Sequence, residues 1–368
     1  MRAAVVIEQC WHRVPGGTAR AAIDQIAAVA ATGQVDQVGV AARHTQPPLD
    51  AWRPGLPVRQ LPLPRIVMYW AWHLARRPSV ERATGPVDLI HATGYAIPPR
   101  TKPLIVNLYD LAWKHDKGTF TRNGVRFFEA SLACVIDDAD LVLCPSQATL
   151  EDCAAAGIGR DRLRHVPLGT TMVDVSDEEV DRVRRLYGLT GRYVLSVSTL
   201  EPRKNLPRLL DAFGRLGGEQ YEDVTLVVVG PEGWGSSLAA PAEALRDRLR
   251  LTGFVPTAHL APLYRGASVV CYPSLWEGFG LPVLDAMAAG APVVTSAGTS
   301  TEELVEGGIG LAVDPHDTDA IAGALARVLD DDDLAGELRR AGRVRAAEMT
   351  WDRTAQLTVA AYEEALGR

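Results

Sequence analysis

The sequence has no long hydrophobic run and few cysteines. No apolar stretch reaches the roughly 18 residues that a membrane-spanning helix needs. Residues 1–10 contain Val5-Val6-Ile7 but no long apolar region and no small-residue cleavage site, so we expect no signal peptide. The five cysteines form no CxxC pair, which argues against a disulfide framework and a zinc site. We therefore expect thiols, buried or at the surface, in a cytoplasmic protein.

Several catalytic signatures are also missing. The chain has neither a Walker A motif nor a Gly-x-Ser-x-Gly elbow, and its eight histidines show no metal-ligand spacing. Acidic runs at 138–140 and 330–333 adjoin expected helix ends, where carboxylates cap helices or face water. We therefore expect no metal at these runs.

The charge is unevenly divided along the chain. Residues 1–170 contain 19 Lys and Arg against 15 Asp and Glu, whereas the remainder has a net charge of −11. The positive surplus in the first part is too small to indicate nucleic acid as a partner. It leaves open a weak attraction to an anionic surface or acceptor.

What the sequence does have is a regular alternation of short apolar strands with amphipathic helices, which is typical of parallel α/β layers. Strands are expected at 3–8, 35–41, 89–91, 104–108, 141–145, 193–198, 224–230, 249–253, 267–272, 292–296 and 311–313. Helices are expected at 19–32, 125–137, 147–156, 206–216, 241–248, 257–265, 317–329 and 351–366. The pattern is weak only between residues 44 and 64, where prolines crowd.

Two such series in one chain predict two doubly wound, Rossmann-like domains that face each other across a cleft. We expect one domain over residues 1–175 and a second over residues 185–350. The last helix, at 351–368, has no strand after it and is expected to pack back on the first domain. Ligands of such sheets bind at the carboxyl ends of the strands.

The run from Ser274 to Met287 is the most informative part of the chain. A β-rich stretch leads into a glycine-rich loop, which then opens a helix with Pro282 in its first turn and Gly290 after its end. A helix N-terminus next to Gly278 and Gly280 is suited to a bound anion. Glu277 from the loop and Asp285 from the helix could hold neighbouring hydroxyls of that ligand.

Two cations follow the strand expected at 193–198. Arg203 can bind a pyrophosphate with two hydrogen bonds and Lys204 as a point charge, while Asn205 can cap the next helix. Alone, these residues would be ordinary loop charges, but the glycine loop makes phosphate binding the better interpretation. Gly16 and Gly17 form a short glycine turn before the first helix. That turn could also approach a phosphate.

Residues 68–74, with the sequence Met-Tyr-Trp-Ala-Trp-His-Leu, are aromatic at helical spacing and are followed by Arg76-Arg77. Packing against the first domain is the default interpretation. The alternative is a lip for an acceptor or for the inner face of a membrane, because aromatic and cationic side chains suit that boundary.

Three segments carry a resemblance to a known family: Ser198–Asn205, Gly253–Val255 and Pro273–Pro282. They resemble the family 4 retaining glycosyltransferases with the GT-B fold, also called glycosyl transferases group 1. The likeness covers most of residues 190–330. It is weaker at residues 15–18, 110–112 and 145–149.

The resemblance implies a nucleotide-sugar donor, no metal and no other cofactor. Arg203 and Lys204 would bind the donor pyrophosphate, and Glu277 would contact the donor sugar. The other implied donor-binding residues are Gly16, Gly17, Gly253, Phe254, Val255, Gly278, Phe279, Gly280, Leu281 and Asp285. The acceptor-side candidates are Tyr109, Asp110 and His91. The implied reaction is transfer with retention at the anomeric carbon, in which the leaving phosphate accepts the acceptor's proton.

The chain departs from the family pattern at two positions. Asp285 stands where the second acidic residue is usually Glu, and Tyr109 stands where a His often precedes the Asp-Leu pair. These departures leave open a nucleotide-sugar-binding protein without catalysis. A sugar-nucleotide hydrolase or epimerase also stays open, because such enzymes can share this two-domain fold. Donors of the GDP-mannose and UDP-glucose type both fit, as do glycan, lipid-linked and small polyol acceptors. No feature predicts the oligomeric state.

Overall fold

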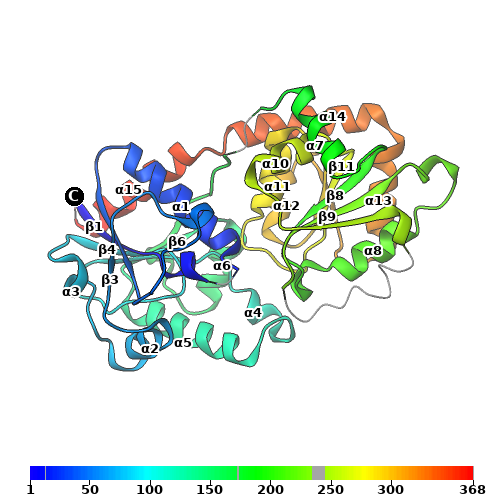
Figure 1. Ribbon diagram of the computed structural model, residues 1–368. Coiled ribbons are helices and arrows are strands. Elements are labelled where there is room, and N and C mark those ends of the chain that lie inside the picture. Colours follow the sequence, from blue (N-terminus) through cyan, green and yellow to red (C-terminus); the bar gives the residue numbers. More distant parts are fainter. Residues whose placement is uncertain (13, 172–173, 234–244, 368) are drawn as a thin grey trace. The chain divides into compact units, whose positions relative to one another are not determined.

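The computed structural model describes residues 1–12, 14–171, 174–233 and 245–367. The chain divides into two compact units (Figure 1). Unit 1 comprises Met1–Gly169 and Thr350–Arg368, and unit 2 comprises Thr170–Met349. Among the described residues, no helix combines the length and the apolar character needed to cross a bilayer.

Unit 1 is built on a parallel sheet in the order β3-β2-β1-β4-β5-β6-β7. Its strands are β1 Arg2–Val6, β2 Asp36–Ala41, β3 Val58–Gln60, β4 Leu89–Ala92, β5 Leu104–Asn107, β6 Leu141–Cys144 and β7 Leu163–His165. The α-helices are α1 Gly16–Ala31, α2 Arg65–Trp70, α3 Glu81–Thr84, α4 Ala112–His115, α5 Arg122–Asp138, α6 Gln147–Ala155 and α15 Trp351–Ala365. Shorter turns are η1 Glu8–Trp11, η2 Asp50–Trp52, η3 Ala71–Ala75, η4 Lys117–Thr119 and η5 Arg160–Arg162.

The two faces of this sheet are covered by different helices. Helices α1 and α15 lie together over one face, and α2 and α5 lie on the other side (Figure 1). Met68 of α2 and Trp72 of η3 share a buried cluster with Ile90 and Val106 of the central strands. This apolar contact fixes the inward side of the α2–η3 segment.

Unit 2 is built on a second parallel sheet, in the order β10-β9-β8-β11-β12-β13. Its strands are β8 Tyr193–Val197, β9 Thr225–Val229, β10 Leu249–Gly253, β11 Val269–Tyr272, β12 Val293–Ser296 and β13 Leu311–Val313. The α-helices are α7 Asp177–Leu186, α8 Leu206–Gly214, α10 Thr257–Arg265, α11 Leu281–Ala289, α12 Ser300–Val305, α13 Thr318–Asp330 and α14 Asp332–Ala347. Shorter turns are η6 Pro202–Lys204, η7 Glu219–Tyr221 and η8 Arg246–Arg248.

Helices α8 and α13 bury their apolar sides on one face of the second sheet. Phe213 of α8 and Leu325 of α13 pack with Val194 of β8 and Val294 of β12 in one core cluster. Both sheets have the strand order of doubly wound, Rossmann-like units, which confirms the predicted fold class.

The predicted strands differ from the observed ones mainly at the sheet edges. β3 and β7 were not predicted: each has only three residues, and β3 lies in the proline-rich stretch. The first helix begins at Gly16, three residues earlier than predicted, with Pro15 at its N-cap position. Of the helix predicted at 241–248, residues 241–244 lie outside the described residues, and Arg246–Arg248 form a 3-10 turn. All five cysteines are buried free thiols.

Candidate active site

Two loops of unit 2 meet because of the strand order. Strands β8 and β11 are neighbours, although β9 and β10 lie between them in sequence. After β8 the chain turns toward β9 on one side, and after β11 it turns toward β12 on the other. At such a point the loops leaving the carboxyl ends of the two strands separate and leave room for a ligand. The loops here carry Arg203-Lys204 and Glu277.

Glu277 bridges the two cations. Lys204 Nζ donates a hydrogen bond to Glu277 Oε1 at 2.6 Å, and Arg203 Nη1 donates to Glu277 Oε2 at 3.0 Å. The guanidinium of Arg203 also donates from Nη2 to Glu201 Oε1 at 3.0 Å. Lys204 Nζ has a further partner in the Tyr272 hydroxyl at 2.7 Å. Two positive and two negative side chains thus form one nearly buried cluster.

The environment of the cluster keeps Glu277 ionised. Burial alone would raise its pKa, but the charges of Arg203 and Lys204 and the hydrogen bond from Lys204 outweigh burial and lower the pKa to about 2. Burial and the neighbouring charge of Arg203 lower the pKa of Lys204 from its ordinary value, and Glu277 opposes that shift. At neutral pH Glu277 is therefore an anion that can accept hydrogen bonds and has no proton to give.

Backbone contacts hold the two loops together. Leu275 N donates to Arg203 O at 2.8 Å, and Arg203 Nη1 donates to Trp276 O at 2.9 Å. The predicted cap by Asn205 is wrong. Asn205 does stand before α8, but its Nδ2 donates to the carbonyls of Pro273 at 3.0 Å and Pro315 at 2.7 Å. Asn205 has a left-handed backbone, with φ 57°. Its side chain links the start of α8 to the segments at Pro273 and Pro315.

The glycine loop ends at Gly280, the N-cap residue of α11, which has φ +100°. A Cβ at this position would lie 2.6 Å from Thr301 Cγ2, so a side chain would meet both backbone strain and a clash. As predicted, Pro282 lies in the first helical turn and Gly290 forms the left-handed C-cap. Ser300 Oγ donates to the Glu277 carbonyl at 2.8 Å, which ties the loop to α12.

Asp285 bonds to the beginning of unit 2. It is half-buried on α11, and its Oδ1 accepts a hydrogen bond from Thr170 Oγ1 at 2.8 Å. Thr170 is the first residue of unit 2, so this bond attaches the beginning of the unit to the site helix.

The remaining donor-side candidates in unit 2 differ in exposure. Gly253 ends edge strand β10 and accepts a hydrogen bond from Gly230 N at 2.9 Å. Phe254, with 61% of its surface exposed, is open to a ligand, whereas Val255 and Phe279 are buried. Gly278 is also buried, and Leu281 is partly buried at the start of α11.

In unit 1, Gly16 and Gly17 open α1 near the carboxyl end of β1. Gly16 has φ +65°, and no heavy atom lies within 4 Å of a Cβ built on either glycine. The backbone of this turn is therefore uncrowded on that side within the described residues.

Two of the acceptor-side candidates, His91 and Tyr109, are part of an internal polar network. His91 is buried on β4, with Nδ1 2.7 Å from the Tyr362 hydroxyl and Nε2 2.9 Å from Asn107 Oδ1. Burial lowers the pKa of His91 to about 4. Asn107 Nδ2 donates to the hydroxyl of buried Tyr109 at 3.0 Å, and Asp110 Oδ1 accepts from Ala112 N at 3.1 Å. His91 thus joins α15 to the sheet, with both ring nitrogens taken up by protein atoms.

Four residues of unit 2 whose side chains make these contacts carried no predicted role: Glu201, Tyr272, Thr170 and Ser300. Glu201 stands inside a matched motif, and an acidic residue two positions before Arg203 was a usable signal for an ion pair. The other three have no local signal, because each acts through a partner far away in the sequence.

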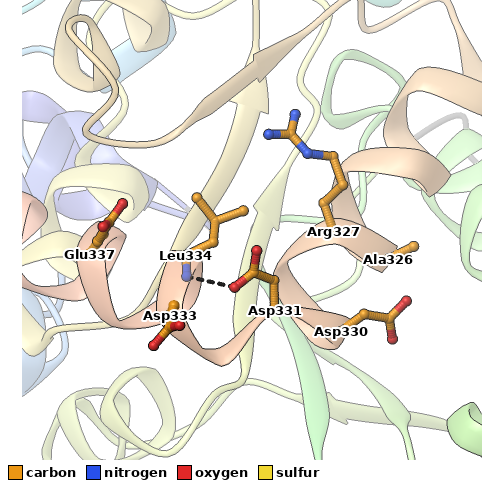
Figure 2. Close-up of a pocket in the computed structure, with 7 residues that line it drawn as sticks. All are labelled: Ala326, Arg327, Asp330, Asp331, Asp333, Leu334 and Glu337. Atoms are coloured by element: carbon orange, nitrogen blue, oxygen red, sulfur yellow. Dashed lines mark hydrogen bonds between the residues drawn. The ribbon is translucent and has the colours of Figure 1, made fainter.

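A separate surface pocket lies between α13 and α14 (Figure 2). Arg327 and the acidic residues Asp330, Asp331, Asp333 and Glu337 line it, together with Ala326 and Leu334. As expected for this acidic run, Asp331 caps a helix: its Oδ1 accepts from Leu334 N at 2.9 Å (Figure 2). No residue of the Glu277 cluster lines this pocket. In the described part of the chain, no group of three or more His, Cys, Asp or Glu is arranged to hold a metal ion.

Comparison with known proteins agrees with this fold. The family described as "Glycosyl transferases group 1" matches residues 177–345, and "Glycosyl transferase 4-like domain" matches residues 16–169. O-antigen chain mannosyltransferase B of Escherichia coli is 32% identical over 289 residues, which are 75% of this chain and 74% of that protein. Serotype-specific mannosyltransferase WbdA of Escherichia coli is 29% identical over 251 residues, 66% of this chain but 31% of that longer protein.

Among solved structures, HepE of Anabaena in complex with UDP and glucose has a TM-score of 0.77 at 18% identity, covering 99% of this chain and 100% of that one. Two doubly wound units with this structural likeness define a protein of the GT-B fold. The chain belongs to the glycosyl transferases group 1 family, and the protein is a glycosyltransferase.

Proposed function

We propose that this protein is a metal-independent, retaining hexosyltransferase. It moves a hexose from a nucleoside-diphosphate sugar of the GDP-mannose or UDP-glucose type to an acceptor hydroxyl on a glycan, a glycolipid or a small polyol. The names of the two related mannosyltransferases favour a mannose-type sugar. The UDP and glucose in the HepE structure support a nucleotide-sugar donor of this general kind.

The observation that carries the proposal is the cluster of Arg203, Lys204 and Glu277 at the carboxyl ends of β8 and β11. Fixed cations in a nearly buried site attract a diphosphate and stabilise the negative charge that develops on it as the sugar leaves. In the proposal, Arg203 and Lys204 supply this charge, so the transfer needs no metal.

Glu277 has the complementary role. As a carboxylate with a pKa of about 2, it can accept hydrogen bonds from sugar hydroxyls throughout the physiological pH range. In the proposal the diphosphate binds beside Arg203 and Lys204 and replaces part of their hydrogen bonding to Glu277. Glu277 then accepts hydrogen bonds from the donor sugar instead. Glu277 therefore orients the sugar, and no proton transfer is assigned to it.

The remaining roles follow the same scheme. The backbone at Gly278, Phe279, Gly280 and Leu281 supports the sugar and phosphate. Asp285 gives up its hydrogen bond from the Thr170 hydroxyl and accepts one from the donor ribose. Exposed Phe254, with its neighbours Gly253 and Val255, borders the base.

In unit 1, Gly16 and Gly17 approach the phosphates, and Tyr109 and Asp110 remain acceptor-side candidates. His91 is assigned to holding α15 because both of its ring nitrogens are bonded inside the unit. The acceptor hydroxyl attacks on the face from which the diphosphate leaves, and the leaving phosphate takes its proton.

A thermal-shift panel of UDP, GDP and their hexose conjugates tests the donor, because a ligand that binds only the folded state raises the unfolding temperature. We expect one nucleotide and its sugar to stabilise the protein clearly more than the others. A flat response to every nucleotide would overturn the donor assignment.

Turnover separates the proposed transfer from its two rivals. Nucleoside diphosphate should be released at a substantial rate only when an acceptor is added. Release without an acceptor would identify a hydrolase, and isomerised donor would identify an epimerase. Tight donor binding with no product from any acceptor would identify a binding protein.

Metal independence has its own test. Activity should stay within about twofold after dialysis against EDTA, since Arg203 and Lys204 are proposed to supply the charge that a metal would otherwise provide. Loss of activity in EDTA that is restored by Mg²⁺ or Mn²⁺ would contradict this part of the proposal while leaving transfer itself intact.

A further inference from the structure

Six buried polar side chains of unit 1 are joined by hydrogen bonds into one network. They come from α15, α1, β4 and β5 and from the residue two positions after β5. Each is at most 7% exposed: Thr358, Gln25, Asn107, His91, Tyr362 and Tyr109. Because these groups are buried and bond to one another, the direction of each hydrogen bond follows from what its neighbours can donate or accept.

The direction is set at Thr358 on α15. Its hydroxyl lies 2.7 Å from the backbone carbonyl of Thr354, which can only accept, so the single hydroxyl proton is committed there. Gln25 must then present its amide nitrogen to Thr358 Oγ1, at 2.8 Å. If the amide were turned around, two oxygens would face each other without a proton between them. Gln25 Oε1 is therefore left as an acceptor.

Asn107 and His91 continue the same direction. Asn107 Nδ2 donates to Gln25 Oε1 at 2.6 Å, which leaves Asn107 Oδ1 to face His91 Nε2 at 2.9 Å. His91 Nε2 must therefore carry a proton. Burial lowers the pKa of His91 to about 4, so the ring is neutral at neutral pH and its Nδ1 accepts from the Tyr362 hydroxyl at 2.7 Å.

Tyr109 lies at the end of this network. Asn107 Nδ2 donates its second proton to the Tyr109 hydroxyl at 3.0 Å, so the hydroxyl oxygen is the acceptor in that bond. Its own proton is left over, and no protein group in the described part of the chain accepts it. Tyr109 is only 7% exposed, and a buried donor without a partner costs free energy. Tyr109 also follows the carboxyl end of β5, the edge at which such sheets bind ligands.

We propose that Tyr109 donates this proton to an oxygen of the acceptor and so helps to select it. Thr358, Gln25 and Asn107 are positioning residues, because they act by fixing the direction of the Tyr109 hydroxyl. An acceptor hydroxyl or phosphate oxygen has the lone pair that this proton requires, whereas an ammonium group has none. The inference rests on the proposed transfer reaction, in which Tyr109 lies on the acceptor side.

Tyr109→Phe tests the contact with the acceptor, because it removes the hydroxyl and keeps the ring. At saturating donor, kcat/KM for the acceptor should fall about tenfold, as expected for the loss of one hydrogen bond. The dissociation constant of the nucleoside diphosphate should stay within about twofold, since its proposed site is in unit 2. Unchanged acceptor kinetics would overturn the inference, and so would an effect confined to the donor.

A double-mutant cycle separates positioning from a general effect on the fold. Thr358→Val removes the proton that sets the direction, so it should lower kcat/KM for the acceptor severalfold, and Thr358→Ser, which keeps a hydroxyl, should restore it. In the Tyr109→Phe background, Thr358→Val should change kcat/KM by less than about twofold, because the hydroxyl through which it acts is gone. Equal losses in both backgrounds would refute the positioning role.

The matched control is Thr84→Val. Thr84 is also buried in unit 1, and its hydroxyl donates to the Gly85 carbonyl at 2.8 Å, outside this network. The acceptor kinetics of this variant should equal those of the unchanged protein. Circular dichroism checks that every variant is folded.

Nitrogen-15 NMR of the protein with labelled histidine tests the direction without any substrate, and it keeps the test decisive if Thr358→Val does not fold. At neutral pH the His91 signals, identified by their loss in His91→Asn, should be those of a neutral ring protonated on Nε2. A proton on Nδ1 would mean that the network runs the other way and would overturn the inference. If no acceptor supports transfer, the proposed function fails, and this spectrum still decides the direction of the network.

Discussion

At the scale of single residues, the candidate site is an ion cluster. It joins Arg203 and Lys204, which are proposed to bind the diphosphate, to Glu277, which is proposed to bind the sugar. Glu277 accepts hydrogen bonds from Lys204 at 2.6 Å and from Arg203 at 3.0 Å, so the site contains its own anion. The buried cations are paired, which avoids the large cost of an isolated charge. Under the proposed function, the diphosphate therefore has to compete with Glu277 for the same cations.

Lys204→Ala should weaken the binding of the nucleoside diphosphate by about 2 kcal/mol, or roughly thirtyfold, as expected for loss of a charged hydrogen bond. Isothermal titration with the preferred diphosphate measures the change. Arg215→Ala is the control, because Arg215 pairs with Asp319 on the surface of the same unit. Equal affinity in Lys204→Ala and the unchanged protein would show that Lys204 does not bind the phosphates.

The lowered pKa of Glu277 predicts a pH-dependent contribution to stability. Its folded-state pKa of about 2 lies below the ordinary value of 4.5, so the carboxylate stabilises the fold above pH 4.5 and loses that effect as the pH falls toward 2. The full contribution at neutral pH is on the order of 3 kcal/mol.

Urea unfolding of the protein and of Glu277→Gln at several pH values checks this contribution. The stability difference between them should be largest near neutral pH and shrink below about pH 4.5. A difference that does not change with pH would contradict the ion-pair account. The same variant should lose more activity than affinity for the bare diphosphate, because Glu277 is assigned to the sugar.

At the scale of secondary-structure elements, the site depends on how α11 begins. Gly280 has φ +100° and lies where a Cβ would come within 2.6 Å of Thr301 Cγ2. The turn that this glycine permits sets the direction of α11 relative to the loop carrying Glu277. Thr301 belongs to α12, so the two helices share this constraint.

Gly280→Ala should destabilise the protein by about 1–3 kcal/mol and reduce turnover, because it combines an unfavourable backbone conformation with a clash. Gly323→Ala is the matched control: Gly323 lies within α13, and a Cβ there would meet no heavy atom within 4 Å. The Gly323→Ala change should leave the stability unchanged or raise it by up to about 1 kcal/mol. Thermal unfolding of the two variants compares them; a Gly280→Ala protein as stable as the control would contradict the strain argument.

At the scale of the whole molecule, each unit has a sheet and a hydrophobic core of its own. Unit 1 includes the end of the chain, since α15 contacts α1 and Tyr362 bonds His91 inside that unit. Unit 2 is a single continuous segment, Thr170–Met349, that contains every residue of the Glu277 cluster.

The segment Thr170–Met349, expressed alone, should therefore fold and bind the preferred nucleoside diphosphate within about tenfold of the full-chain affinity. Circular dichroism and titration calorimetry measure both properties. The fragment should catalyse no transfer, because the acceptor side is assigned to unit 1. A soluble, folded fragment without affinity for the diphosphate would show that unit 2 does not hold the donor site alone.

The sequence alone determined most of the strands and helices and the family. Alternation of apolar strands and amphipathic helices is a local property, and it located β10 and β13, the two edge strands of the second sheet, at their observed bounds. The motif around Glu277 was equally readable, because Pro282 and Gly290 mark the limits of α11 by their own backbone preferences. Among the strands, β3 and β7 lacked enough pattern to be found, and among the helices α7, α12 and α14 were not predicted.

Only the tertiary structure decided which of these residues touch. Lys204 and Glu277 are 73 positions apart, and they bond because β8 and β11 are neighbours in the sheet. Local pattern carries no information on that strand order. Local pattern likewise could not show that His91, predicted on the acceptor side, bonds to Tyr362. Tyr362 lies 271 positions later and holds His91 in the core. The residue types set which contacts were chemically possible, and the packing of distant segments selected the ones that form.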